Sequence, residues 1–81
     1  MGEVKQAVGG RVVRVLRKPS GDGPLEQFFI VGIDDNWKAK EAVSASHETA
    51  YGMMQIVGKI SPKMAENFGL WNNEVRRIVP E

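Results

Sequence analysis

The hydrophobic and polar positions of this chain divide it into strand-like and helix-like segments. Residues 11–18 and 27–33 are rich in β-branched and aromatic residues, which is typical of β-strands. The second run, QFFIVGI, is apolar at nearly every position and predicts a central strand covered on both faces. Between the two runs, PSGDGP holds two prolines and two glycines and predicts the loop of an antiparallel hairpin.

Apolar residues then recur at helical spacing from about residue 36 to 49. Asp34, Asp35 and Asn36 precede this segment, and each can cap the N-terminus of a helix. Periodicity leaves residues 51–60 open between helix and strand. Gly52 and Gly58 would each cost a helix roughly 1 kcal/mol relative to alanine, and the β-branched residues nearby favour a strand. We therefore predict a helix followed by a strand.

The C-terminal part begins with a helix signal and ends in an ambiguous segment. Ser61 can cap a helix, Pro62 suits its first position, and Gly69 is a common residue at a helix end. Asn72 and Asn73 then predict a turn, since asparagine tolerates the left-handed conformation. Residues 74–79 fit either a short helix or an edge strand, and we favour the strand.

Together these segments predict a single small α+β domain of order β-β-α-β-α-β. We expect a largely antiparallel sheet with two helices on one face, a flexible N-terminal tail over residues 1–10, and the domain itself over residues 11–81. Helices on one face leave the other face of a sheet partly uncovered. The apolar run at 27–33 therefore needs a further cover, either from the tail or from a second copy of the chain.

Composition narrows the classes of function. The chain has 81 residues with 11 Lys and Arg against 10 Asp and Glu, so its net charge of +1 does not indicate a polyanion partner. It has no cysteine, which excludes disulfides and thiolate zinc sites and fits a reducing compartment. No apolar run approaches the ~20 residues that span a bilayer. We expect a cytoplasmic protein without a membrane partner.

Residues 62–79 resemble the helix-turn-helix signature of bacterial regulators. Ala65, Gly69 and Val75 have the spacing of its packing, turn and anchor residues. The resemblance implies contacts to DNA bases from four side chains: Asn72, Asn73, Arg76 and Arg77. Trp71 stands where such a motif usually has a serine or threonine cap, and Pro80 cuts the second helix short. DNA binding is therefore the alternative hypothesis.

Catalytic chemistry has no support in the sequence. His47 is the only histidine, and metal sites need several ligands, so we predict no catalytic, cofactor-binding or metal-binding residues. Trp37 and Trp71 are candidate interaction anchors, because exposed tryptophans often dominate interfaces. For Trp37 we favour burial at the sheet edge, since tryptophan is highly buried on average. The leading hypothesis is a non-enzymatic protein-interaction module that binds another protein or forms a homodimer.

Overall fold

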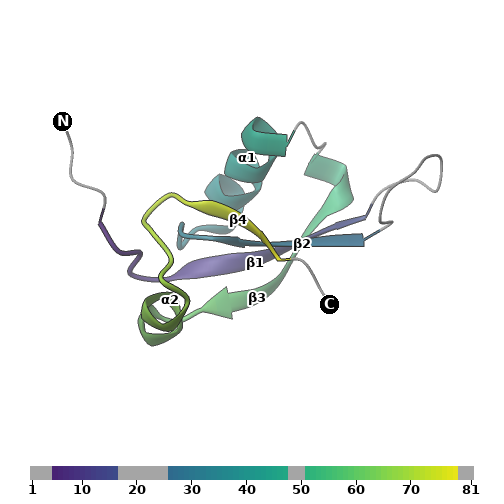
Figure 1. Ribbon diagram of the computed structural model, residues 1–81. Coiled ribbons are helices and arrows are strands. Elements are labelled where there is room, and N and C mark those ends of the chain that lie inside the picture. Colours follow the sequence, from purple (N-terminus) through teal and green to yellow (C-terminus); the bar gives the residue numbers. More distant parts are fainter. Residues whose placement is uncertain (1–4, 17–25, 48–50, 79–81) are drawn as a thin grey trace.

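The computed structural model describes residues 5–16, 26–47 and 51–78, and it confirms the predicted α+β fold (Figure 1). The elements in chain order are β1 Gly10–Leu16, β2 Glu26–Val31, α1 Asn36–His47, a 3₁₀ turn Tyr51–Met53, β3 Met54–Ile60, α2 Pro62–Phe68 and β4 Val75–Ile78. The expected PSGDGP loop lies outside the described residues. The two ambiguous segments, at 51–60 and 74–79, both contain strands, as the sequence favoured.

The four strands form one antiparallel sheet of order β3-β1-β2-β4. The apolar strand β2 lies inside the sheet, as its composition predicts, with Phe29 paired to Val13 of β1 and to Arg77 of β4. Strands β3 and β4 form the two edges. The sequence thus placed its most apolar strand between neighbours, where its backbone groups bond on both sides.

The main core lies between one face of the sheet and α1. Side chains alternate between the two faces of a strand, so Val13, Phe29 and Val31 share the face that α1 covers. Ala39 and Val43 of α1 contact them and are fully buried. Because these helix residues are small, α1 packs close to the sheet.

A second, smaller core lies on the opposite face, at one end of the strands. Ile30 and Ile60 pack there against Ala65 of α2 and against Ala7 and Leu70. The two helices therefore lie on opposite sides of the sheet, α1 above and α2 below in Figure 1, and not on one face as expected from the sequence. The physical reason is that α1 already fills its face, whereas Ile30 and Ile60 point the other way and Ala65 covers them.

The N-terminal segment packs against the turn after α2. The Ala7 N–H donates to the Leu70 carbonyl at 3.0 Å, and the Asn72 N–H donates to the Lys5 carbonyl at 2.7 Å. Ala7 is only 2% exposed. The expected flexible tail is therefore wrong for residues 5–9, while residues 1–4 lie outside the described residues. Gly10 lets the start of β1 approach β2 closely, because a Cβ at this position would lie 2.0 Å from the Val31 carbonyl oxygen.

Local capping chemistry sets the start of both helices and the end of α2. The Asp35 carboxylate accepts a hydrogen bond from the Lys38 N–H at 2.9 Å, and Ser61 Oγ accepts one from the Met64 N–H at 3.1 Å. Gly69 ends α2 in the left-handed conformation with φ 62°. Asn73 has φ 67°, which confirms the predicted turn before β4. This turn sends the chain back along β2.

Candidate protein-interaction face

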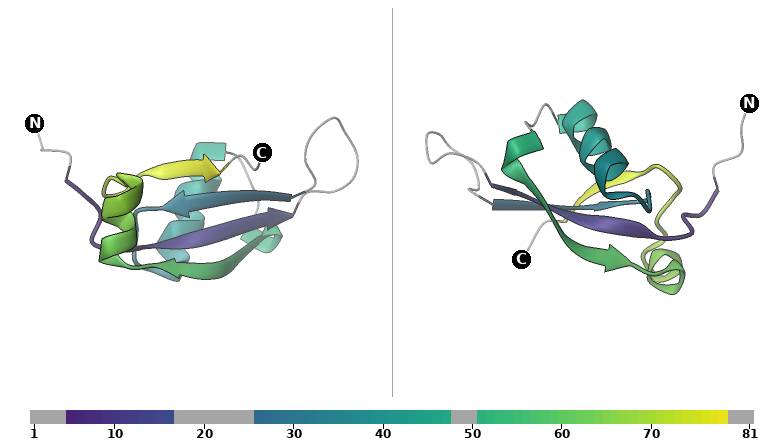
Figure 2. Two further views of the ribbon diagram at one scale, coloured as in Figure 1. Left: turned by 60° about the horizontal axis from the view of Figure 1, so that its bottom comes forward. Right: turned by 180° about the vertical axis from the view of Figure 1, so that it is seen from behind.

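One face of the sheet is only partly covered. Figure 2, left, shows this face coming forward, with α2 crossing the strands at one end and no described helix over the remainder. We call this uncovered part the open face. Strand alternation and register place these strand residues on it: Arg14, Leu16, Glu26, Phe28 and Ile78. Leu16 and Ile78 are each 41% exposed, and Phe28 is half-buried.

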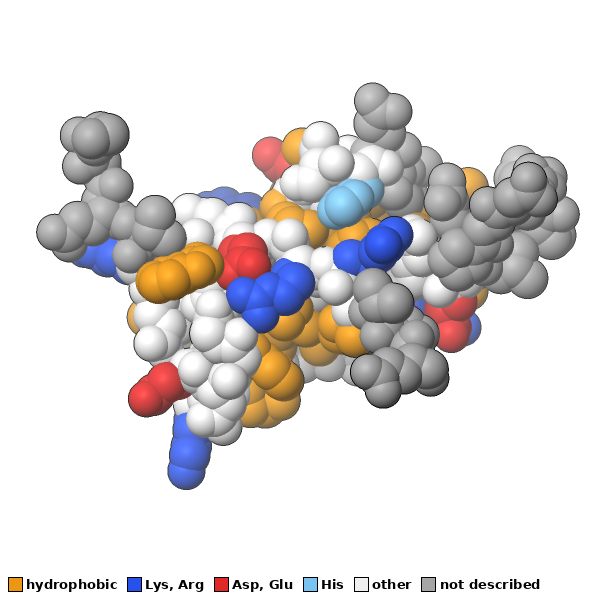
Figure 3. Space-filling view, in the orientation of Figure 1, with side chains coloured by type: hydrophobic (Ala, Val, Ile, Leu, Met, Phe, Trp, Pro, Cys, Tyr) orange, Lys and Arg blue, Asp and Glu red, His pale blue; other side chains and the backbone are white. Residues whose placement is uncertain are grey.

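The neighbouring side of α2 extends the hydrophobic part of the open face. Met64 and Phe68 are one helical turn apart on the same side of α2, and they are 42% and 47% exposed. Ala65, which is fully buried, is the residue of α2 that seals the sheet. Figure 3 shows hydrophobic side chains gathered beside α2 toward the middle of the sheet, with charged side chains on its outer side. The open face therefore combines strand and helix side chains.

The charges on the open face are paired within the chain. Arg14 forms a salt bridge with Glu26 across β1 and β2, and its guanidinium also donates to Gln55 Oε1 at 3.1 Å. The register explains this contact, since Gln55 of β3 stands directly opposite Arg14. The face thus presents apolar side chains around a neutral, hydrogen-bonded group.

Arg76 links β4 to the end of α2. Its guanidinium donates to the Phe68 carbonyl at 2.7 Å and to the Gly69 carbonyl at 3.1 Å, both left unbonded by the end of the helix. It also donates to both carboxylate oxygens of Glu74, at 2.8 and 2.9 Å. The hydrogen bonds from Arg76 are the main reason that the pKa of Glu74 lies below its usual 4.5. The Trp71 N–H also donates to Glu74 and lowers this pKa further, whereas burial of the carboxyl raises it. Arg76 therefore holds α2 at the border of the open face.

The helix-turn-helix interpretation of residues 62–79 is wrong in its geometry. Val75–Ile78 is a strand bonded to β2, so the described part of the motif, residues 62–78, has no second helix that could enter a DNA groove. Arg76 is engaged with carbonyl groups and Glu74, and Asn73 forms the turn. Asn72 and Arg77 are exposed, but Arg77 lies beyond the turn along β4, on the face that α1 covers. The four residues do not form one reading surface.

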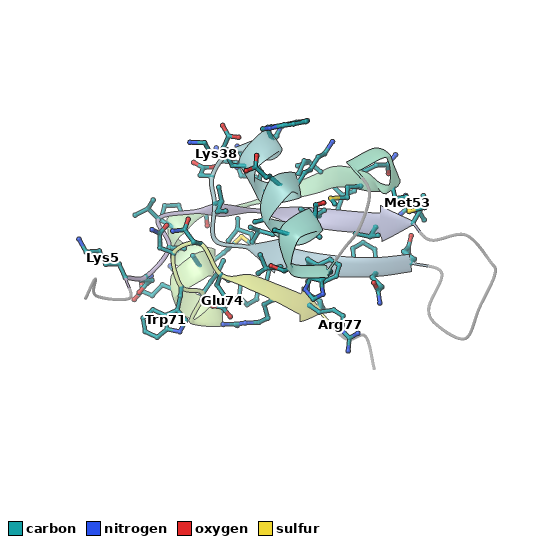
Figure 4. The ribbon with its side chains drawn as sticks, turned by 90° about the horizontal axis from the view of Figure 1, so that it is seen from above. Lys5, Lys38, Met53, Trp71, Glu74 and Arg77 are labelled. Atoms are coloured by element: carbon teal, nitrogen blue, oxygen red, sulfur yellow. The ribbon has the colours of Figure 1, made fainter. Side chains whose placement is uncertain are left out.

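The two tryptophans lie outside the open face. Trp37 is in the first turn of α1 and is 60% exposed, so the expected burial at the sheet edge is wrong. Its neighbours Ala39 and Val43 already fill the contact between α1 and the sheet. Trp71 is 49% exposed, and Figure 4 shows it near Lys5 at the end of the molecule where α2 meets the N-terminal segment. The structure does not bring the two side chains together.

His47, the last residue of α1, stacks on the core. Its ring lies 4.6 Å from the Phe29 ring, centroid to centroid, with a tilt of 43°. Within the described residues, no three His, Asp or Glu side chains gather where they could hold a metal ion. No described helix has the length and apolarity to cross a membrane.

Sequence reasoning anticipated that the run at 27–33, which includes Phe28, needs a cover on its second face, but it did not predict that Met64 and Phe68 would border this face. Met64 and Phe68 read as the buried side of a short amphipathic helix, because three of the seven residues of α2 are Met, Ala and Phe. Only the packing shows that Ala65 alone meets the sheet. When the chain was compared with known proteins, no family model, no curated protein and no solved structure matched it.

Proposed function

We propose that this protein is a non-enzymatic protein-interaction module whose contact surface is the open face. The observation that carries the proposal is the group of exposed or half-exposed hydrophobic side chains on that face: Leu16, Phe28, Met64, Phe68 and Ile78. Exposed hydrophobic side chains gathered on one face and bordered by polar groups are typical of protein contact sites. The expected cytoplasmic location stays a prediction.

The fold supports a binding role by holding this surface rigidly. Strand β2 is fixed between β1 and β4, and Arg76 fastens the end of α2 beside it. A preorganised surface loses less conformational freedom on binding than a mobile one. The backbone that carries Phe28 and Phe68 is therefore held in place on the sheet and at the end of α2.

Self-association is the first form of this function to test, because a second copy would cover the apolar strand β2 as the sequence suggests. Sedimentation equilibrium of the full chain over a wide concentration range distinguishes a 9.0 kDa monomer from a species of twice that mass. The variant Ile78→Glu places a charge on the open face without filling the core, and it should reduce self-association at least tenfold. Val8→Glu is the matched control, since Val8 is 76% exposed and belongs to the N-terminal segment.

Binding of a different protein is tested by photo-crosslinking in living cells. A photoreactive phenylalanine analogue replaces Ile78 in one experiment and Val8 in another, in otherwise identical chains. The proposal expects one or a few discrete adducts from position 78 and not from position 8. Equal adducts from both positions, together with a monomeric chain at all concentrations, would overturn the proposal.

A further inference from the structure

The two edge strands of the sheet differ in how readily they could bond to a further strand. Strand β4 is four residues long and contains two arginines, and a short, charged edge strand offers little to a pairing partner. Strand β3 is seven residues long, contains no proline and carries a single charged residue, Lys59. Within the described part of the chain, β1 is its only neighbour in the sheet. By length and charge, β3 is therefore the edge more open to pairing.

The sequence of β3 favours pairing with a second copy of itself. It reads MQIVGKI, and its β-branched residues Ile56, Val57 and Ile60 have a high preference for strands. Val57 is 48% exposed, so part of this hydrophobic strand is accessible to solvent. Segments of about six or seven residues with high strand preference, low charge and no proline associate with their own copies. A second copy of β3 is therefore a suitable partner for this edge.

Charge repulsion does not prevent this pairing. When two identical strands pair antiparallel about a common centre, residues equally far from the centre face each other. With Val57 at the centre, Lys59 of one copy would face the neutral Gln55 of the other. Like charges directly opposite each other destabilise a strand pair, and this register places none opposite. The single charge of β3 therefore gives the edge little protection from a second copy.

A β-bulge interrupts β3 at the centre of this edge. Val12 of β1 pairs with Gly58. Its neighbour Val13 pairs with Ile56, so Val57 is an extra residue without a partner on β1. A bulge bends its strand, increases the local twist and breaks the regular row of backbone N–H and C=O groups. Figure 2, right, shows β3 running at a steep angle to β1 and β2, so the edge does not present the flat row that a further strand needs.

We propose that the bulge at Val57 keeps β3 from bonding to the β3 strand of a second copy and so protects this edge of the sheet. In native sheets, bulges twist edge strands away from pairing partners. The bulge is a separable feature of the strand, because Val57 lies between two regular pairs and its removal would leave every other β1–β3 pair in register. This inference is independent of the proposed function, which concerns the open face.

Deletion of Val57 in the full chain tests this proposal, because it makes β3 a regular edge strand. The deletion chain should fold and should self-associate at least about tenfold more tightly than the wild type in sedimentation equilibrium, since several new backbone hydrogen bonds form between copies. Hydrogen exchange gives a second readout. The β3 amides that point away from β1 should exchange rapidly in the wild type and become protected as the concentration of the deletion chain rises. Contact through the open face would not bond these amides, so this readout separates the two surfaces.

Val57→Ala is the matched control, because it removes the exposed side chain and keeps the extra residue in β3. Its outward-pointing β3 amides should exchange as rapidly as those of the wild type. A deletion chain that folds but leaves these amides unprotected at all concentrations would overturn the proposal. An unfolded deletion chain would overturn it as well, because Val57 would then be required for the β1–β3 register. Protection that rises with concentration in the wild type would show that the bulge does not keep the edge unpaired.

Discussion

The guanidinium of Arg76 donates a hydrogen bond to the backbone carbonyl of Phe68 at 2.7 Å and so joins an edge strand to the end of a helix. The same side chain reaches the Gly69 carbonyl and both oxygens of Glu74. A planar guanidinium can satisfy several acceptors at once, which lysine cannot. This contact fixes α2 on the sheet beside the open face.

Arg76→Ala should therefore lower the free energy of unfolding by about 1–2 kcal/mol, because helix-end carbonyls and a carboxylate lose their charged donor. Arg76→Lys should recover only part of this loss. Arg77→Ala is the control on the same strand, since Arg77 is exposed and should change stability by about 0.5 kcal/mol or less. Urea denaturation of the three variants measures these differences. Equal losses for positions 76 and 77 would contradict the role given to Arg76.

The pH dependence of stability should report on Glu74. Hydrogen bonds from Arg76 lower the pKa of Glu74 below its usual 4.5 in the folded chain. A lowered folded-state pKa stabilises the fold above pH 4.5, and that stabilisation is lost as the pH falls through the folded pKa. Glu74→Gln should be less stable than the wild type by about 1 kcal/mol at pH 7, as for other partly exposed pairs. The difference should shrink steadily in denaturation curves recorded below pH 4.5, and a constant difference would show that Glu74 is not the titrating group.

Gly32 should tolerate no side chain, because a Cβ there would lie 2.1 Å from the Trp71 carbonyl oxygen. The same residue donates to the Glu74 carbonyl at 2.8 Å and accepts from the Asn73 N–H at 2.9 Å, so its backbone cannot move freely away. Gly32→Ala should cost about 1–3 kcal/mol in the free energy of unfolding. Gly52→Ala is the control, since a Cβ at Gly52 meets no atom within 4 Å. Thermal unfolding of both variants compares them, and similar midpoints would refute the close approach.

Both tryptophans should be accessible to a quencher in the folded monomer. Trp37 is 60% exposed and Trp71 is 49% exposed. Acrylamide should therefore quench the fluorescence of the folded chain almost as strongly as that of the urea-unfolded chain. The single-tryptophan variants Trp37→Phe and Trp71→Phe assign the signal to each residue. Strong protection of Trp37 would indicate the burial that the sequence favoured and contradict the exposed position described above.

Local chemistry made most of the elements predictable from the sequence. Ser61, Pro62 and Gly69 carry the start and end of α2 in their own conformational preferences. The apolar run in β2 indicates an interior strand, because only a position between neighbours buries both of its faces. The segment at 74–79 was harder, since Val75 and Ile78 have the spacing of one helix face and the segment does not alternate cleanly as a strand does. Its strand conformation is set by bonding to β2, which is distant in sequence.

The sequence by itself determined the fold class, the ends of α2 and the turn before β4. Tertiary structure alone decided that α2 packs opposite α1, that Trp37 is exposed, and that Met64 and Phe68 border an uncovered sheet face. The physical reason is that burial depends on which surfaces compete for the same space. Ala39 and Val43 fill one face of the sheet and Ala65 seals one end of the other, so the larger side chains are left outside. The pattern of residues within one helix or strand does not show which element will cover a given face of the sheet.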